Sequence, residues 1–313
     1  MTFPEPFRAR PARHEDLDAL VELLEARDLV DVGFVDQARD EILQDWAGSF
    51  VELERDTVVA EAADGSIAAY GVVLAFDPAV QVAAMGRVHP IHAGRGLGSA
   101  ILAEQERRAA ERLATGITSP FRSSTPSTDE AARRLFTHRG YRHVRSSWLM
   151  QRSLPADDLE RPDPDGIDFR SGRAGDEPLV HAVLMEAFRQ HFGYEPVPFG
   201  EWRRWMHEAP GYDPGLAVLA FADGVLAGVS VNFTADDGAG WVGDLGVLPR
   251  FRRTGIASAL LVRSFAALTA SGHHEVRLGV DIENESGATH LYEGAGMRVR
   301  RRFDTYEKRL TGA

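Results

Sequence analysis

Two arginines and a glycine in the last third of the sequence are spaced as an anion-binding turn requires. The stretch LPRFRRTGIASALL places Arg252 and Arg253 just before Gly255. We expect a strand to end ahead of Pro249, which cannot donate to a sheet ladder, and a helix to begin directly after Gly255. The free N–H groups and the dipole at a helix start attract anions. Two arginines beside them suit a pyrophosphate.

A second stretch, VDIENESGATHLYEGAGM, brings a phenol into a similar setting. It predicts a strand that ends near Asp281 and a loop that holds Asn284. The helix that follows carries Tyr292 and ends at Gly296. Taken alone, Tyr292 is better explained as a core aromatic whose hydroxyl is satisfied, and the arginines are better explained as solvated charges at a helix start.

Two other phosphate-binding motifs do not match. A P-loop needs Gly-Lys-Ser/Thr, and Lys308 is the only lysine of the chain. A dinucleotide fingerprint needs G-x-G-x-x-G, whereas Gly94, Gly96 and Gly98 are spaced G-x-G-x-G.

The glycine-marked turn occurs twice, because the chain repeats itself. HPIHAGRGLGSAIL, in the first half, has the same order of strand end, turn and helix as the later stretch. The offset between matching glycines is nearly constant: 159 residues for Gly65 and Gly224, 159 for Gly96 and Gly255, and 156 for Gly140 and Gly296. Such a register indicates a tandem duplication of one unit of strands and helices.

The length of 313 residues also suits two domains. SLPADDLERPDPDG carries three prolines and several acids, which is typical of an exposed linker. We therefore predict an N-terminal domain over 1–153, a linker over 154–166 and a C-terminal domain over 167–313.

Composition excludes several function classes. The net charge is −12 and the pI is near 5.4, which argues against general binding to nucleic acid or to an anionic membrane. The absence of cysteine excludes disulfides, thiolate metal sites and cysteine nucleophiles. The start of the sequence has no secretory signal pattern, and no apolar run is long enough for a membrane span, so we expect a cytoplasmic protein.

Together, the two C-terminal stretches resemble the GNAT superfamily of acyl-CoA N-acyltransferases. The pyrophosphate motif of that family, Arg/Gln-x-x-Gly-x-Gly/Ala, is matched by Arg252, Gly255 and Ala257. Its later motif is matched by Asn284, Ala288, Leu291, Tyr292 and Gly296. The resemblance covers both halves, and AFRQHFGYEPVPFGEW is similar to the tandem two-domain type that includes mycothiol synthase and its actinobacterial relatives.

The resemblance implies an α/β fold of the α+β type: two tandem GNAT folds, each a mixed central sheet flanked by helices. It implies an enzyme that moves an acetyl group from acetyl-CoA to a primary amine of a small molecule in a ternary complex, without a metal. A protein or peptide N-acetyltransferase and a non-catalytic acyl-CoA sensor stay open as alternatives, and the chain is expected to be a monomer or a homodimer.

The resemblance also assigns site residues. Tyr292 is expected to protonate the departing CoA thiolate. Asp244, near the start of the central strand, is the candidate base, although an acid there could equally bind a cationic substrate or lie at the sheet surface. The expected donor contacts are Leu245, Val247, Arg252, Arg253, Thr254, Gly255, Ile256, Ala257 and Asn284. The corresponding candidates in the first copy are Val88, Arg95, Gly96 and Gly98.

The first copy differs from the second at the positions that carry chemistry. Arg252, Asp244, Tyr292 and Asn284 correspond to Ala93, Met85, Phe136 and Thr128. Since Phe136 cannot donate a proton, we predict that only the C-terminal domain is catalytic. Candidate acceptor contacts are His191, Glu201 and His207, while Trp202 and Trp205 are expected to pack the region that covers the acceptor.

Overall fold

The chain forms two compact units. The computed structural model describes residues 3–35, 38–48, 50–77, 81–156, 162–209, 211–235, 238–283 and 287–312. The first unit comprises Met1–Ser146 and Arg302–Ala313, and the second comprises Ser147–Arg301. The expected linker, 154–166, belongs to the second unit, and its residues 157–161 lie outside the described part of the chain.

The sheet of the first unit is mixed. Its strands follow the order β1-β2-β3-β4-β5-β12, and all neighbours are antiparallel except β4 and β5, which are parallel. The strands are β1 (Arg8–Arg10), β2 (Thr57–Glu61), β3 (Ile67–Asp77), β4 (Gln81–Val88), β5 (Thr118–Pro126) and β12 (Arg298–Thr311), which belongs to this unit from Arg302 onward.

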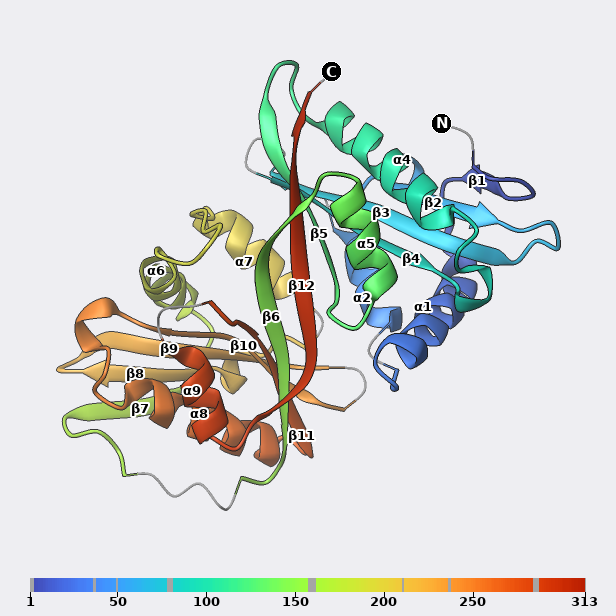
Figure 1. The fold of residues 1–313 in the computed structure, drawn as a ribbon. Coiled ribbons are helices and arrows are strands. Elements are labelled where there is room, and N and C mark those ends of the chain that lie inside the picture. Colours follow the sequence, from blue (N-terminus) through green and yellow to red (C-terminus); the bar gives the residue numbers. More distant parts are fainter. Residues whose placement is uncertain are drawn as a thin grey trace. The chain divides into compact units, whose positions relative to one another are not determined.

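Helices cover both faces of this sheet, as Figure 1 shows. One face carries α1 (Leu17–Asp31) and α2 (Ala38–Ala47), and the other carries α4 (Leu97–Arg112) and α5 (Glu130–His138). Shorter elements are η1 (His14–Asp16), α3 (Leu53–Asp56) and η2 (Pro90–His92). The central strands are apolar on both sides because both sides are buried.

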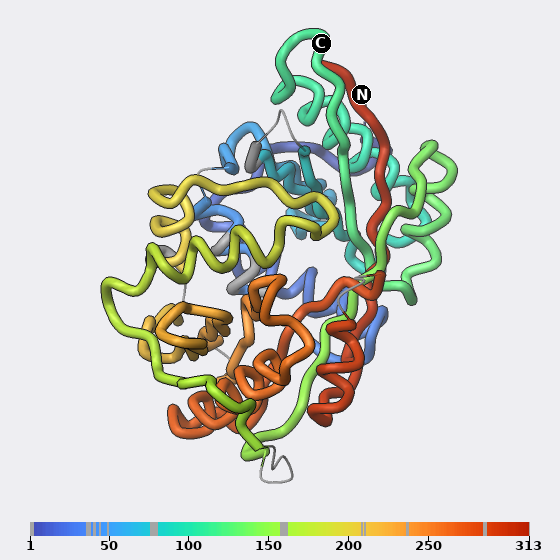
Figure 2. Tube along the Cα trace, turned by 90° about the vertical axis from the view of Figure 1, so that its left-hand side faces the viewer, coloured from blue at the N-terminus to red at the C-terminus, as the bar shows by residue number. Residues whose placement is uncertain are grey.

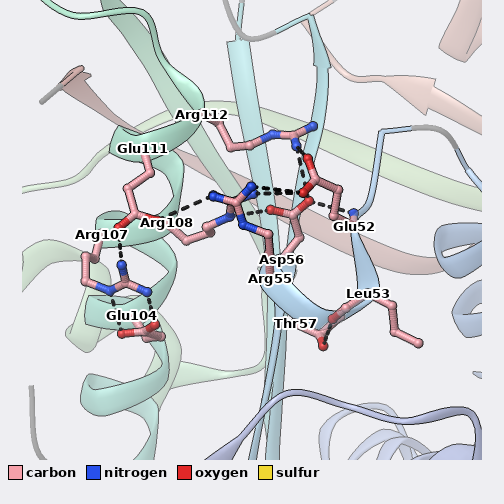
Figure 3. Close-up of polar contacts among 10 residues, drawn as sticks. All are labelled: Glu52, Leu53, Arg55, Asp56, Thr57, Glu104, Arg107, Arg108, Glu111 and Arg112. Atoms are coloured by element: carbon pink, nitrogen blue, oxygen red, sulfur yellow. Dashed lines mark hydrogen bonds and ion pairs between the residues drawn. The ribbon is translucent and has the colours of Figure 1, made fainter.

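A buried ion pair joins α3 to α4 in the first unit. The side chain of Asp56 is fully buried, and its Oδ1 accepts a hydrogen bond of 2.6 Å from Nε of Arg108. Arg112, one turn further along α4, pairs with Glu52, and Figure 3 shows the four side chains together. Removal of one partner of such a pair costs about 3–5 kcal/mol, since the other charge stays buried.

The sheet of the second unit repeats this plan. Its order is β6-β11-β10-β9-β8-β7, again with a single parallel pair, β10 and β11. The strands are β6 (Arg142–Ser153), β7 (Ile167–Ser171), β8 (Val218–Ala222), β9 (Val225–Thr234), β10 (Gly240–Val247) and β11 (Glu275–Asp281).

The helices of the second unit also pack on both faces. The helices α6 (Glu177–Ala187) and α7 (Phe199–Glu208) lie on one face, and α8 (Ile256–Ala270) lies on the other. Two further elements are η3 (Pro214–Leu216) and η4 (Pro249–Phe251), and α9 (Ala288–Gly294) precedes β12.

The duplicated plan extends to single contacts. Arg10 pairs with Asp16 at 2.7 Å in the first unit, and Arg170 pairs with Asp176 at 2.6 Å in the second. In both pairs the arginine is the last or the second-last residue of a strand, and the aspartate is the N-cap residue of the next α-helix. The expected fold class, two tandem mixed sheets flanked by helices, is confirmed.

Each unit takes its last strand from the other half of the sequence. β12, near the C-terminal end of the sequence, pairs with β5 of the first unit from Phe303↔Pro126 to Thr311↔Thr118, and Figure 2 shows the red strand beside it. β6 pairs instead with β11, from Ser147↔Asp281 to Ser153↔Glu275. The two similar segments that end the sequence repeats are therefore exchanged between the units.

The described residues have no membrane-spanning helix and no cluster of metal-binding side chains. None of the described helices is long and apolar enough to cross a membrane. The same residues hold no group of three or more His, Asp or Glu side chains that could bind a metal ion.

Candidate active site

A cavity opens in the second unit where its two parallel strands diverge. β10 and β11 pair only at Gly240↔Val276 and Trp241↔Arg277. Beyond these pairs a cavity of about 650 Å³ lies between the strands, the end of α6 and the start of α8. Its lining includes the expected residues Asp244, Leu245, Val247, Arg252, Arg253, Gly255, Ala257 and Tyr292.

A β-bulge in β10 precedes Asp244. The register with β9 shifts between Val242 and Asp244, so that Gly243 is the extra residue. A Cβ atom at Gly243 would lie 2.4 Å from the ring of Phe233, so this position does not accept a side chain without a shift. After the bulge, Asp244 lies opposite Val231 and lines the cavity. Burial raises the pKa of Asp244 to about 6.

Tyr292 lines the same cavity from α9 and is 8% exposed. Burial, followed by the charge of Asp244, raises the pKa of Tyr292 to about 12. The phenol therefore keeps its proton at neutral pH, and it is close enough to Asp244 to sense the carboxylate.

The glycine-marked turn before α8 has the expected form. Gly255 precedes the first helical residue at φ +89°, a conformation that residues with a side chain rarely adopt. Arg253 is also in the left-handed region, at φ +63°. Such a conformation costs about 1–2 kcal/mol for a residue other than glycine. The first copy has Gly94 at that position, at φ +76°.

Arg252 does not extend into the cavity as a free cation. Its Nη2 donates a hydrogen bond of 2.7 Å to the carbonyl of Ala187, and its Nε donates one of 3.2 Å to the carbonyl of Val247. One edge of the guanidinium is thus occupied by main-chain acceptors.

The end of α6 supplies the other wall of the cavity. Ala187, Phe188 and His191 line it, and the rings of Phe188 and His191 lie 4.7 Å apart. Burial and then the charge of Arg252 lower the pKa of His191, against an opposing effect of Asp281. His191 is therefore mainly neutral at pH 7.

The other expected acceptor contacts are not among the residues that line this cavity. His207 lies 3.6 Å from Glu177 in an ion-pair geometry, and Glu201 lies on the same helix α7. Trp202 is buried between α6 and α7, as expected for a packing residue.

Two expected donor contacts have side chains with other surroundings. Thr254 donates its hydroxyl to the carbonyl of Phe251 at 2.7 Å, and Ile256 is 1% exposed within the hydrophobic core. The main chain of either residue still lies at the helix start. Asn284 lies outside the described residues.

Asp281 was not singled out from the sequence as a site residue, yet it lines the cavity at the end of β11. Its position in the first unit is held by Thr125, since Trp241 pairs with Arg277 just as Val82 pairs with Phe121. The sequence does contain a signal for Asp281: it is an acid at a strand end beside the turn, where the first copy has the neutral Thr125.

The first unit has a smaller cavity in the corresponding place, of about 270 Å³. Val88, Gly96 and Gly98 line it with Phe136, whereas Arg95 lies over the ring of Phe7 at 4.6 Å and is not part of the lining. No register shift occurs around Met85.

The parallel strands of the first unit, β4 and β5, stay paired further along their length than β10 and β11 do. They remain together as far as Ala84↔Ser123. The buried side chain of Gln105 donates hydrogen bonds to the carbonyls of Val72 and Met85. The opening between the strands is correspondingly shorter.

Relatives of this chain are found among acetyltransferases. Residues 179–297 match the model of the acetyltransferase (GNAT) family. The chain is 32% identical over 221 residues to the mycothiol acetyltransferase of Thermobispora bispora, which covers 67% of this chain and 70% of that protein.

Solved structures show the same tandem fold. The GCN5-related N-acetyltransferase from Sphaerobacter thermophilus is 32% identical, with a TM-score of 0.87 over 100% of this chain and 98% of that one. The tandem GNAT protein from the clavulanic acid biosynthesis pathway has a TM-score of 0.76 over 98% of this chain and 99% of that one, and at 14% identity it supports the fold alone. The chain therefore belongs to the acetyltransferase (GNAT) family, in a tandem two-domain form related to the mycothiol acetyltransferases.

Proposed function

We propose that the second unit transfers the acetyl group of acetyl-CoA to a primary amine of a small molecule, by direct attack in a ternary complex. One observation carries this proposal. Asp244 and Tyr292 share a cavity with the anion-attracting start of α8, while the first unit has Met85 and Phe136 at the same two positions. The first unit accordingly serves as a non-catalytic partner in this proposal.

The donor's diphosphate is assigned to the start of α8. The free N–H groups behind Gly255 and the helix dipole favour an anion there, and Arg253 adds a full charge beside them. The strained backbone of Arg253 supports a ligand-binding role, because a glycine would relieve the strain and the first copy has one. A cavity of about 650 Å³ has room for the thioester end of the donor.

The thioester oxygen is assigned to the N–H of Val247. Leu248 donates its N–H to Ala227 on β9, and successive residues of a strand point their N–H groups to opposite edges. The N–H of Val247 therefore points away from β9, toward the side on which β10 and β11 diverge. A main-chain donor there would stabilise the oxyanion of the tetrahedral intermediate.

The reaction balances without a further reactant. The nitrogen lone pair of the amine attacks the thioester carbon, and the C–N bond forms as the carbonyl becomes an oxyanion. Attack makes the nitrogen strongly acidic, so a carboxylate with a pKa of about 6 such as Asp244 can take its proton. The oxyanion then collapses, the C–S bond breaks, and the thiolate leaves with a proton or a hydrogen bond from Tyr292.

The pKa of Tyr292 and that of the leaving thiol together determine how the phenol can act. A free thiol has a pKa near 8.5, well below the value of about 12 for this phenol. With Asp244 charged, full proton transfer to the thiolate would be uphill by about 3–4 pKa units. Protonation of Asp244 removes one cause of the raised pKa, so the phenol becomes a better acid after the amine has lost its proton.

The acceptor class is tested with native protein and two variants. Acetyl-CoA is supplied with a panel of small primary amines, amino sugars and aminoacyl compounds included, and free CoA is measured. The native protein is expected to acetylate at least one amine. Asp244→Asn and Tyr292→Phe should each lower kcat by about 10²–10⁴-fold while still binding acetyl-CoA.

A matched control is Tyr212→Phe, which removes a phenol from the same unit outside the cavity lining and should leave kcat unchanged. Unchanged turnover in Tyr292→Phe would remove the acid role. Binding of acetyl-CoA without transfer to any amine would favour the sensor, and acetylation of proteins in a lysate alone would favour the protein acetyltransferase.

A further inference from the structure

Arg252 joins two elements of the second unit through their main chains. Its Nη2 donates to the carbonyl of Ala187 at 2.7 Å, and its Nε donates to the carbonyl of Val247 at 3.2 Å. The side chain is half-buried. Both bonds use the Nε/Nη2 edge of the planar guanidinium, which is one of its two edges that can hold a phosphate with a pair of hydrogen bonds.

The two carbonyls mark functionally different places. Ala187 is the last residue of α6, and the last carbonyls of a helix have no partner within it. An arginine at that end satisfies one of them and complements the dipole. Val247 is the last residue of β10, the strand that carries the base candidate Asp244.

The residues that follow Ala187 form one wall of the cavity. Phe188 and His191 follow directly, and both line the cavity with their rings 4.7 Å apart. The bond from Arg252 therefore fixes where this wall lies relative to the end of β10. Since the carbonyl and the N–H of one strand residue point to the same edge, the bond to the carbonyl of Val247 also orients the N–H assigned to the thioester oxygen.

In the first unit, the corresponding helix end accepts a hydrogen bond from a different loop. Ala93 stands at the position of Arg252 and cannot form the bridge. The carbonyl of Asp31, at the end of α1, accepts a hydrogen bond of 2.6 Å from Thr128, and Arg27 lies 3.1 Å from Asp129. The bridge to the strand end thus occurs only in the unit that has the candidate acid and base.

We propose that Arg252 is a positioning residue for the acceptor, acting through the end of α6, and that it is not a principal ligand of the donor's diphosphate. This inference rests on the proposed acetyl transfer for its kinetic readout. It reassigns the first arginine of the turn and leaves the anion to the helix start and to Arg253.

The test compares Arg252→Gln and Arg252→Lys with Arg253→Gln, the matched control on the next residue. Calorimetric titration with acetyl-CoA, without acceptor, gives the donor Kd. Steady-state kinetics with an amine that the native protein acetylates give KM and kcat for the acceptor. Circular dichroism and the melting temperature of each variant show whether it is folded.

Arg252→Gln is expected to keep the donor Kd within about threefold and to lower kcat/KM for the acceptor by about tenfold or more, the scale of a charged hydrogen bond. Arg252→Lys should recover part of the loss, because an ammonium can still donate to one carbonyl. Arg253→Gln should have the opposite effect: donor binding should weaken, with a Kd about five- to tenfold higher, and the KM for the acceptor should be nearly unchanged. Equal weakening of donor binding by Arg252→Gln and Arg253→Gln would overturn the proposal.

Hydrogen exchange decides the question even without an acceptor. In Arg252→Gln, the amides of residues 188–192 should exchange faster than in the native protein, whereas Arg253→Gln should leave them unchanged. If no amine is acetylated by the native chain, the proposed function fails, but the exchange pattern and the donor Kd still report on Arg252. Unchanged exchange at 188–192 in a folded Arg252→Gln would show that the bridge positions nothing.

Discussion

Asp244 and Tyr292 line one cavity, and the charge of Asp244 helps to raise the pKa of Tyr292 to about 12. The charge of one group thus affects the acidity of the other. In the proposed transfer, the carboxylate would be charged when the amine attacks and neutral once it holds the amine's proton. The phenol becomes more acidic at that moment, when the thiolate is about to leave.

The activity should therefore have an acid limb set by Asp244. Because burial raises its pKa to about 6, the base is charged above that pH and protonated below it. We expect kcat/KM, calculated on the concentration of uncharged amine, to fall about tenfold per pH unit below about pH 6 and to level off above it. Initial rates at subsaturating amine, with donor saturating, measure the limb. If the residual activity of Asp244→Asn falls at the same pH as the activity of the native protein, the acid limb belongs to another group.

The same carboxylate should reduce stability at neutral pH. Its folded-state pKa lies above the ordinary value of 3.8, so the folded chain binds this proton more tightly than the unfolded chain does. The stabilisation is complete below the ordinary pKa and is lost as the pH rises through about 6. Asp244→Asn should therefore stabilise the protein by on the order of 1 kcal/mol at about pH 8, and by less at about pH 5.

Urea unfolding of Asp244→Asn and native protein at the two pH values measures this difference. Asp168→Asn, an exposed position on β7, is the control and should have no comparable effect. A destabilised Asp244→Asn at the higher pH would mean that the charged form makes compensating contacts in the fold.

Restoring the two missing side chains should not make the first unit active. Met85→Asp and Phe136→Tyr would supply a carboxyl and a phenol, but Ala84 would remain paired with Val73 and with Ser123. The bulge that precedes Asp244 in β10 has no equivalent there, and the parallel strands diverge later.

The substitutions belong in a chain inactivated by Asp244→Asn and Tyr292→Phe, so that only the first unit can act. Transfer is expected to stay at the level of the inactivated background. Met85→Asp alone should also destabilise the first unit, because Met85 is 8% exposed within a hydrophobic cluster. Turnover well above the background would show that the bulge is dispensable.

Much of the fold could be predicted from the sequence, because it depends on local patterns that occur twice. The constant register predicted paired elements, and the glycines before α4 and α8 both adopt the left-handed conformation that such turns need. Residues of the turn before α8 and of α9 line one cavity. Short motifs and their spacing specify these features, since each involves neighbours in the chain.

The features that could not be predicted depend on contacts between distant segments. The segments that end in Leu154 and Leu310 are similar, so their sequences indicate two strands but not which sheet each joins. The guanidinium of Arg252 has the same sequence context whether it binds a phosphate or the carbonyl of Ala187. The division at 154–166 likewise stays a prediction about folding units, because it rests on composition alone.

The exchange of strands predicts that a residue near the C-terminal end of the sequence stabilises the first unit. Tyr306 on β12 is 6% exposed, pairs with Ser123 of β5, and stacks on Phe136 with ring centroids 5.1 Å apart. Truncation of a buried aromatic side chain costs about 3–5 kcal/mol.

Tyr306→Ala should therefore accelerate hydrogen exchange at residues 118–126 of the first unit much more than at residues 218–234 of the second. Arg309→Ala, an exposed position on the same strand, should change neither segment by more than about 0.5 kcal/mol. Faster exchange confined to 218–234 would contradict the pairing, because a C-terminal strand that remained with its own half of the sequence would stabilise that half. Protection lost at 118–126 would instead mean that the N-terminal half completes its sheet only with a strand that follows α9, the helix that carries Tyr292.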